Sequence, residues 1–194
     1  MRDIYDYIEV FRGVMDHNDA DQIVTRLQAY NWREHKWGEK VDDPSDGISY
    51  KDDVTHNHDT EFSQAPVETS EKAIIKKAIN EALTRYTRKW PLSNPTAYSP
   101  VSVHKYDADT MMKPHVDHIH TLFDGKIRGI PILSIVGLLN SPDEFQGGQF
   151  VFNDEKDPKL EKGDILIFPS NFIYKHKVQL VTSGTRYSYV TWAF

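Results

Sequence analysis

The spacing of hydrophobic and polar positions changes once along the chain, near residue 98. Before that point, apolar residues recur with helical spacing in two stretches, residues 16–32 and residues 70–90. The first stretch begins at Asp16 or Asn18, either of which can cap a helix. The second carries a long apolar stripe, which predicts a helix that packs on the core.

After residue 98 the period becomes two, which is typical of strands that bury one face. Gly, Pro, Asn and Asp separate the apolar segments. The predicted strands fall in residues 98–106, 113–119, 129–139, 147–152, 163–170, 174–181 and 185–194. Many short strands after a helical start predict a mainly β protein with flanking helices (α+β), built on a jelly-roll core.

We expect a single domain over residues 1–194. Residues 1–97 would supply helical support and a polar loop, and residues 98–194 would form the core. The polar stretch from about 39 to 65 predicts a long loop with room for one short strand. It could close over a site as a lid or be a solvated insertion.

Composition narrows the class of protein. The chain contains no cysteine, so any metal must be held by histidine and carboxylate. The net charge of −6 disfavours a protein that follows nucleic-acid phosphates. No apolar run is long enough to span a bilayer or resembles a signal peptide. We therefore expect a cytoplasmic protein with no membrane partner.

The densest group of metal ligands is the segment "KPHVDHIH" at 113–120. On an extended strand, His115 and Asp117 share one face, and His118 and His120 share the other. Either pair needs a more distant ligand, and His176 lies on a later predicted strand. Two histidines and one carboxylate are the ligand set of non-haem Fe(II) oxygenases. The alternative is a cupin-like site of His118, His120 and His176, with Asp124 as a further ligand.

Residues 98–194 also resemble the Fe(II)/2-oxoglutarate-dependent dioxygenases, in particular the prolyl 4-hydroxylase-like branch. The motifs occur in the expected order, from Tyr106 through the HxD pair and His176 to Arg186 in "GTRYSYVTWAF". The resemblance implies a double-stranded β-helix and the cofactors Fe(II), 2-oxoglutarate and O2, with ascorbate as support. Two positions depart from many relatives: Leu138 stands where some carry tyrosine, and Arg186 where many carry lysine.

The resemblance also implies a role for each matching residue. Iron would be held by His115, Asp117 and His176. The cosubstrate would be bound by Arg186, Tyr106, Ser188 and Ser134. Trp192 would form a wall of the substrate pocket, and we add Arg128 from its position in the loop after the HxD pair.

The function that this implies is hydroxylation of a C–H bond, most directly that of a prolyl residue in a peptide or protein. Hydroxylation of a free amino acid or of another side chain stays open. So do the cupin-like metalloprotein and a binding module without catalysis. Asp117 argues against a halogenase, because related halogenases lack that carboxylate.

Overall fold

The computed structural model describes residues 2–35, 38–41, 49–52, 61–67, 69–90, 92, 95–117 and 131–194. In chain order the elements are η1 (Ile4–Tyr7), β1 (Glu9–Phe11), α1 (His17–Leu27), β2 (Arg33–Glu34), β3 (Gly38–Val41), β4 (Ser49–Asp52), β5 (Ser63–Pro66), α2 (Thr69–Lys89), β6 (Ser102–Tyr106), β7 (Met112–His115), β8 (Leu133–Leu138), η3 (Pro142–Glu144), β9 (Phe145–Gly147), β10 (Phe150–Phe152), β11 (Ile165–Pro169), β12 (His176–Val178), β13 (Val181–Gly184) and β14 (Arg186–Ala193).

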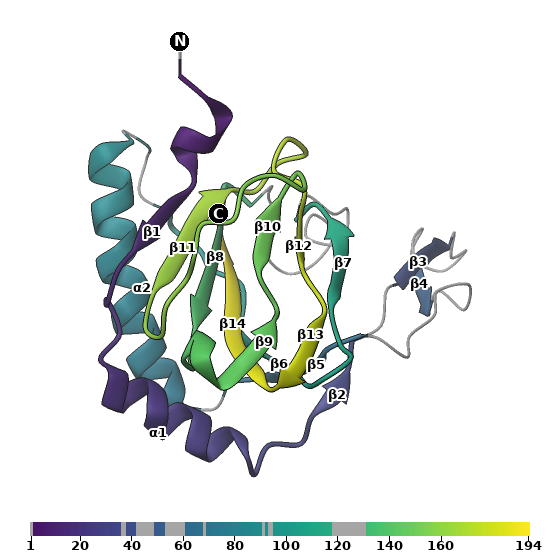
Figure 1. Ribbon diagram of the computed structural model, residues 1–194. Coiled ribbons are helices and arrows are strands. Elements are labelled where there is room, and N and C mark those ends of the chain that lie inside the picture. Colours follow the sequence, from purple (N-terminus) through teal and green to yellow (C-terminus); the bar gives the residue numbers. More distant parts are fainter. Residues whose placement is uncertain are drawn as a thin grey trace.

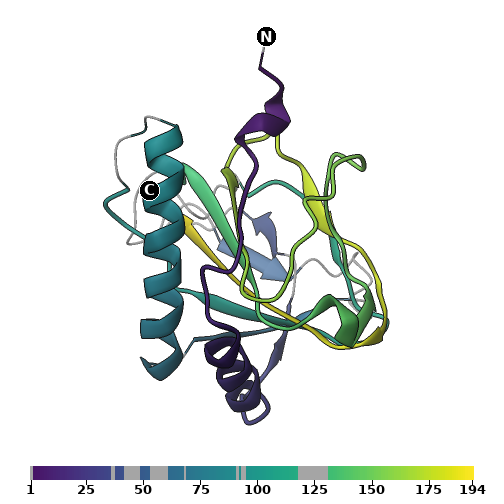
Figure 2. The same ribbon diagram turned by 60° about the vertical axis from the view of Figure 1, so that its left-hand side comes forward.

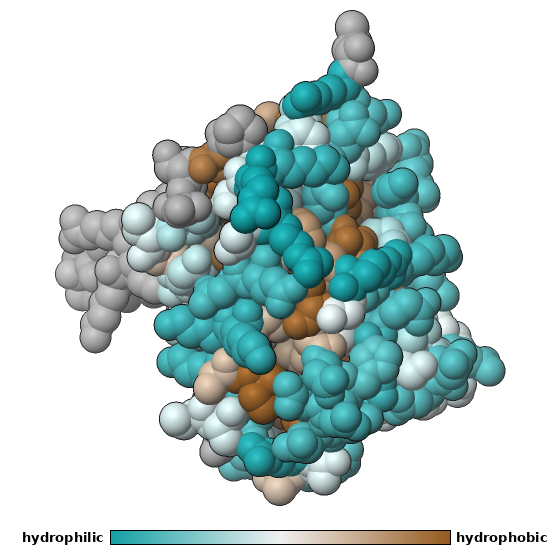
Figure 3. All heavy atoms as spheres, turned by 90° about the vertical axis from the view of Figure 1, so that its left-hand side faces the viewer, coloured by the Kyte–Doolittle hydropathy of each residue, from teal (hydrophilic) through white to brown (hydrophobic). Residues whose placement is uncertain are grey.

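Two antiparallel sheets face each other, and the helices cover the outside of the larger one (Figures 1 and 2). The large sheet has seven strands in the order β1-β11-β8-β14-β6-β5-β2. The smaller sheet has the order β10-β12-β7, and two-stranded pairs join β13 to β9 and β3 to β4. Seen from the helix side, the surface is mostly hydrophilic, with apolar side chains showing along a strip in the middle (Figure 3).

Each face of the large sheet has its own hydrophobic cluster. One cluster joins the buried side chains of α1 and α2 to sheet residues such as Ile135, Tyr187 and Tyr189. The other lies between the two sheets and contains Val136 and Val190. Alternation along buried strands therefore assigns successive residues to the helix side or to the space between the sheets.

The central pair β8–β14 shows how closely these layers pack. Gly137 lies opposite Tyr189 in the register. A Cβ atom added at Gly137 would lie 2.1 Å from the Tyr189 ring, so the ring occupies the space that any other residue at 137 would fill.

The structure confirms both predicted helices, with Asp16 as the N-cap of α1 through a bond from the Asn18 amide. It differs from the prediction in the strands of the N-terminal part. Here β1, β2 and β5 join the large sheet and β3 pairs with β4, whereas the sequence indicated helices and a polar loop with one short strand. These strands have two to four residues, too few for a period to be recognised.

Three of the predicted strands also have different limits. Residues 113–119 are not one strand, because β7 ends at His115 and Asp117 lies in a bend beyond it. Residues 147–152 and 174–181 each span parts of two strands. Gly147 and Gly148, both at positive φ, lie where the chain passes from β9 to β10.

None of the helices in the described ranges is long and apolar enough to cross a membrane.

A buried carboxylate ties the two helices together. Glu71 on α2 accepts hydrogen bonds from Arg26 Nη1 (2.9 Å), Tyr30 Oη (3.0 Å) and Ser70 Oγ (2.7 Å). Burial alone would raise the pKa of Glu71, but the hydrogen bonds from Arg26 and Ser70 outweigh it and lower the pKa to about 2.

We expect Glu71→Ala to lower the free energy of unfolding by about 2 kcal/mol at pH 7. Because the folded-state pKa is depressed, this stabilisation is present above the usual value of 4.5 and is lost as the pH falls toward about 2. Urea denaturation at several pH values measures it. Glu81→Ala, which removes an exposed carboxylate from the same helix, is the matched control. Equal losses in both variants, or a loss from Glu71→Ala that does not shrink between pH 5 and pH 3, would contradict the assignment.

Candidate metal centre and anion pocket

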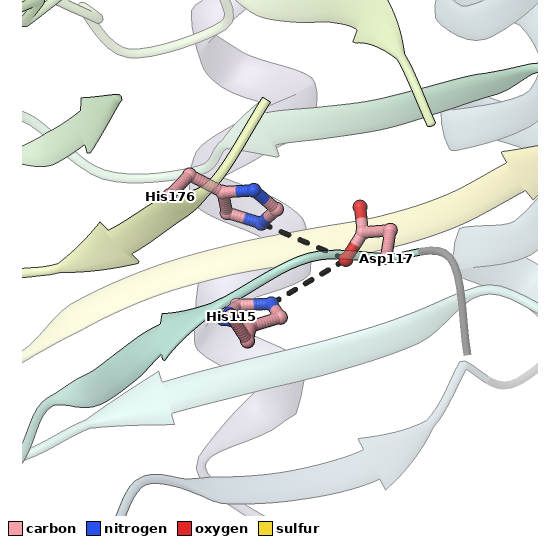
Figure 4. A group of neighbouring side chains, drawn as sticks. All are labelled: His115, Asp117 and His176. Carbon is pink, nitrogen blue, oxygen red and sulfur yellow. Dashed lines mark ion pairs between the residues drawn. The ribbon is translucent and has the colours of Figure 1, made fainter. Parts of the chain in front are cut away.

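Two histidines lie side by side on neighbouring strands of the smaller sheet. β12 pairs with β7 so that His176 lies directly opposite His115, and their ring centroids are 4.2 Å apart. Asp117, two residues beyond β7, turns its carboxylate toward both rings (Figure 4). The predicted set of His115, Asp117 and His176 is therefore brought together, although Asp117 does not share a strand with His115.

The donor atoms of this group converge on one point. Asp117 Oδ1 lies 3.4 Å from His115 Nε2 and 3.6 Å from His176 Nε2. All three ligand atoms lie within 4.8 Å of one another. These separations are long for hydrogen bonds, but they suit three ligands arranged around one ion.

The backbone fixes which nitrogen each ring presents. His115 Nδ1 lies 2.8 Å from the carbonyl of Lys113, and His176 Nδ1 lies 3.0 Å from the carbonyl of Tyr174. A carbonyl only accepts, so in both rings Nδ1 carries the proton and donates. Nε2 then offers its lone pair toward Asp117, which is the tautomer that a metal ligand needs.

The charges of the three groups favour a cation. Burial lowers the pKa of His176 to about 4, so this ring is neutral near pH 7. Burial alone would raise the pKa of Asp117. Electrostatic interactions with His176 and His115, together with the hydrogen bond from Ser134, outweigh it and hold the pKa of Asp117 well below its usual range. A buried carboxylate beside neutral imidazole nitrogen fits a divalent metal such as Fe(II).

The cluster opens into a cavity of about 140 Å³ between the two sheets. Its walls near the cluster are apolar and include Val136, Phe150 and Val190. Its polar end carries Arg186 and Ser188, which alternation places on the inner face of β14.

Arg186 is a buried cation beside this cavity. Its side chain is almost fully buried, Nη1 donates to Ser188 Oγ (2.8 Å), and the guanidinium lies 5.2 Å from the centre of the Tyr106 ring. Within the described ranges, no carboxylate lies within ion-pair distance of Arg186. Burial lowers the pKa of Arg186, yet a guanidinium stays charged at physiological pH. A buried, unneutralised cation at the end of a cavity favours an anionic ligand there.

Tyr106 and Gly148 shape the surroundings of Arg186. Burial raises the pKa of Tyr106, so the phenol is a neutral donor; its hydroxyl contacts Met112 Sδ at 3.6 Å. Gly148 adopts φ +68°, and a Cβ there would lie 3.0 Å from Arg186 Cδ. The glycine therefore leaves room for the aliphatic part of the arginine.

The other predicted residues divide into three groups. Trp192 lines the cavity, as expected for a pocket wall. Ser134, expected beside the cosubstrate, is not among the described residues that line the cavity; its hydroxyl contacts Asp117 Oδ2 and Ser170 instead. The remaining positions, His118, His120, Asp124 and Arg128, lie outside the described residues.

Several lining residues were missed, and His104 is a polar one among them. His104 lines the cavity from β6, between Ser102 and Tyr106. Burial, with a contribution from the charges of His35 and Arg186, lowers its pKa to about 3, so the ring is a neutral polar group. The alternation that assigned Tyr106 to the inner face of the strand also assigned His104, since the two are two residues apart.

The C-terminal half of the chain matches a known family. The 2OG-Fe(II) oxygenase superfamily matches residues 101–194. A PKHD-type hydroxylase of Xylella fastidiosa strain M23 is 25% identical over 194 residues, covering 92% of this chain and 75% of that protein. A PKHD-type hydroxylase of Psychrobacter sp. strain PRwf-1 is 39% identical over 82 residues, which cover 40% of this chain and 31% of that one.

Solved structures share the fold. A viral collagen prolyl hydroxylase of Paramecium Bursaria Chlorella virus-1, in complex with 2OG, has a TM-score of 0.66 at 14% identity, covering 96% of this chain and 94% of the other. A Pseudomonas putida prolyl-4-hydroxylase has a TM-score of 0.61 at 14% identity, covering 96% and 91%. These likenesses confirm the predicted double-stranded β-helix.

The two candidate metal sites make opposite predictions. We expect Asp117→Ala to weaken Co(II) binding by more than about a hundredfold, since loss of a ligand costs more than loss of an outer partner. His120→Ala should leave the affinity unchanged. Competition with a chromogenic chelator measures both variants. Metal binding that survives Asp117→Ala but is lost in His120→Ala would favour the cupin-like site.

Proposed function

Because the chain belongs to the 2OG-Fe(II) oxygenase superfamily, which uses Fe(II), 2-oxoglutarate and O2, we propose that it hydroxylates a prolyl residue in a peptide or protein. The observation that carries the proposal is a single cavity with two sites. A His-Asp-His cluster lies along it, and a buried arginine without a described carboxylate partner lies at its end.

His115, Asp117 and His176 would hold the iron. Their donor set leaves positions open for cosubstrate and dioxygen, which is the arrangement expected of this class of oxygenase. When bound, the iron would activate dioxygen, the oxidant, with 2-oxoglutarate consumed as the two-electron reductant to succinate and carbon dioxide. The chain contributes the fixed tautomers of both histidines and an ionised Asp117, so this carboxyl group need not lose a proton at neutral pH.

Arg186 would bind the distal carboxylate of 2-oxoglutarate. Its planar guanidinium suits bidentate contact with a carboxylate, and burial strengthens that contact. Since Ser188 Oγ accepts from Arg186, its own proton is left to donate to the same anion. Tyr106 would add a neutral hydroxyl. Leu138, where some relatives carry tyrosine, leaves this carboxylate one donor fewer.

The apolar walls would exclude water and orient the substrate. Val136, Phe150 and Val190 line the cavity near the metal cluster, and Trp192 closes part of the same wall. A proline ring is an apolar group of matching character. Support for a prolyl substrate comes from structural neighbours that are prolyl hydroxylases, one of them from Trichoplax adhaerens in complex with a peptide fragment of hypoxia inducible factor (TM-score 0.64, 15% identity, covering 97% of this chain and 83% of that chain).

The proposal is tested by succinate formation from 2-oxoglutarate with Fe(II) and ascorbate. We expect turnover that proline-containing peptides stimulate, with a mass gain of one oxygen on proline, and none with Asp117→Ala. The matched substrate control replaces each proline by alanine. If only free amino acids stimulate turnover, the substrate would be a free amino acid rather than a peptide or protein. No 2-oxoglutarate consumption with any substrate would favour a binding module without catalysis.

Arg186 allows a sharper test of cosubstrate binding. We expect Arg186→Gln to raise the KM for 2-oxoglutarate about a hundredfold, because a buried charge-assisted pair is lost. Arg186→Lys keeps the charge but loses the planar guanidinium that can bind a carboxylate through two hydrogen bonds, so we expect the KM for 2-oxoglutarate to rise about tenfold. Steady-state succinate assays measure both, with the exposed Arg85→Gln as control. A KM unchanged in Arg186→Gln would remove Arg186 from the cosubstrate site.

A further inference from the structure

Asp117 uses its two carboxylate oxygens differently. Oδ1 faces His115 Nε2 and His176 Nε2 at 3.4 and 3.6 Å. Oδ2 points away from the histidines and accepts a hydrogen bond of 2.5 Å from Ser134 Oγ. One oxygen is thus directed to the metal position, and the other is held by the protein.

Ser134 belongs to the opposite sheet. It lies on β8, between Phe168 of β11 and Trp192 of β14, and its side chain is fully buried. The two histidines come from β12 and β7 of the smaller sheet. The contact from Ser134 to Asp117 therefore joins the metal ligands of one sheet to the framework of the other.

A second serine sets the direction of the hydrogen bonds. Ser134 Oγ also contacts Ser170 Oγ, just beyond β11, and Ser170 is buried as well. A hydroxyl has one proton, and an ionised carboxylate only accepts. Ser134 must therefore donate to Asp117, and Ser170 must donate to Ser134. Aligned hydroxyls of this kind polarise each other and strengthen the bond to the carboxylate.

We propose that Ser134, supported by Ser170, is a positioning residue that holds Asp117 with Oδ1 toward the metal and Oδ2 turned away from it. This rests on the proposed metal role of Asp117. Neither serine is among the described residues that line the cavity, so each would act through the carboxylate. Outer partners of metal ligands fix ligand orientation, and their loss costs about ten- to a hundredfold in metal affinity.

The test measures Co(II) affinity and the visible Co(II) spectrum of the full chain without 2-oxoglutarate or substrate. We expect Ser134→Ala to bind Co(II) about ten- to a hundredfold more weakly, with a changed absorption band, because Asp117 loses the contact that orients it. Ser170→Ala keeps the donor at Ser134, so a loss of about three- to tenfold is expected.

The matched control is Thr191→Val. Thr191 is a buried hydroxyl on β14 that donates to the Ser99 carbonyl, on the helix side of the sheet. The Thr191→Val variant should have a lower Tm than wild type, as Ser134→Ala does, but an unchanged Co(II) affinity and spectrum. A merely structural role for Ser134 would make the two variants behave alike.

Three outcomes would overturn the proposal. Co(II) affinity within about twofold of wild type in Ser134→Ala, with an unchanged spectrum, removes Ser134 from this role while Asp117→Ala still abolishes binding. Binding that survives Asp117→Ala overturns the metal assignment itself. If Ser134→Ala does not fold, the proposal is tested with Ser170→Ala instead. Weaker Co(II) binding with a changed spectrum in Ser170→Ala supports the positioning role of the two serines, and an unchanged affinity and spectrum overturn it.

Discussion

The structure depends on burying both faces of one strand. β14 lies in the middle of the large sheet, with helices on one side and the cavity on the other, and seven of its eight residues are buried. Successive side chains of a strand point to opposite faces of the sheet. Because Tyr187 and Tyr189 pack toward the helices, Arg186 and Ser188 face the cavity. A charged residue on the inner face requires a partner, so the strand that closes the core also carries Arg186, where the proposed anion would bind.

The residues of the His-Asp-His cluster are positioned in two different ways, by strand pairing and by side-chain contacts. The register of β12 on β7 sets the separation of His115 and His176, because residues directly opposite in an antiparallel pair are near neighbours. Asp117 lies beyond the strand, where no ladder fixes it. Its position comes from side-chain contacts, with the histidines on one side and Ser134 on the other. The carboxylate is therefore the ligand whose geometry depends most on tertiary packing.

Sequence periodicity was sufficient for α1, α2 and β14, the strand that carries Arg186, since each has a clear apolar pattern. It could not reveal β1, β2 and β5, whose membership in the sheet depends on pairing with distant segments rather than on local pattern. The residues of the cluster followed from their spacing and the family motif. The contact between Ser134 and Asp117 did not, because it joins β8 to a bend beyond β7, and no local signal encodes the relative position of these two segments.

The tight fit at Gly137 has a consequence for how this sheet can vary among related chains. The Tyr189 ring fills the volume where a Cβ at 137 would lie, so the two positions share a single space. A larger residue at 137 is compatible only with a smaller one at 189. Related sequences should therefore exchange side-chain size between these two sites as a pair, which would identify the β8–β14 register from aligned sequences alone.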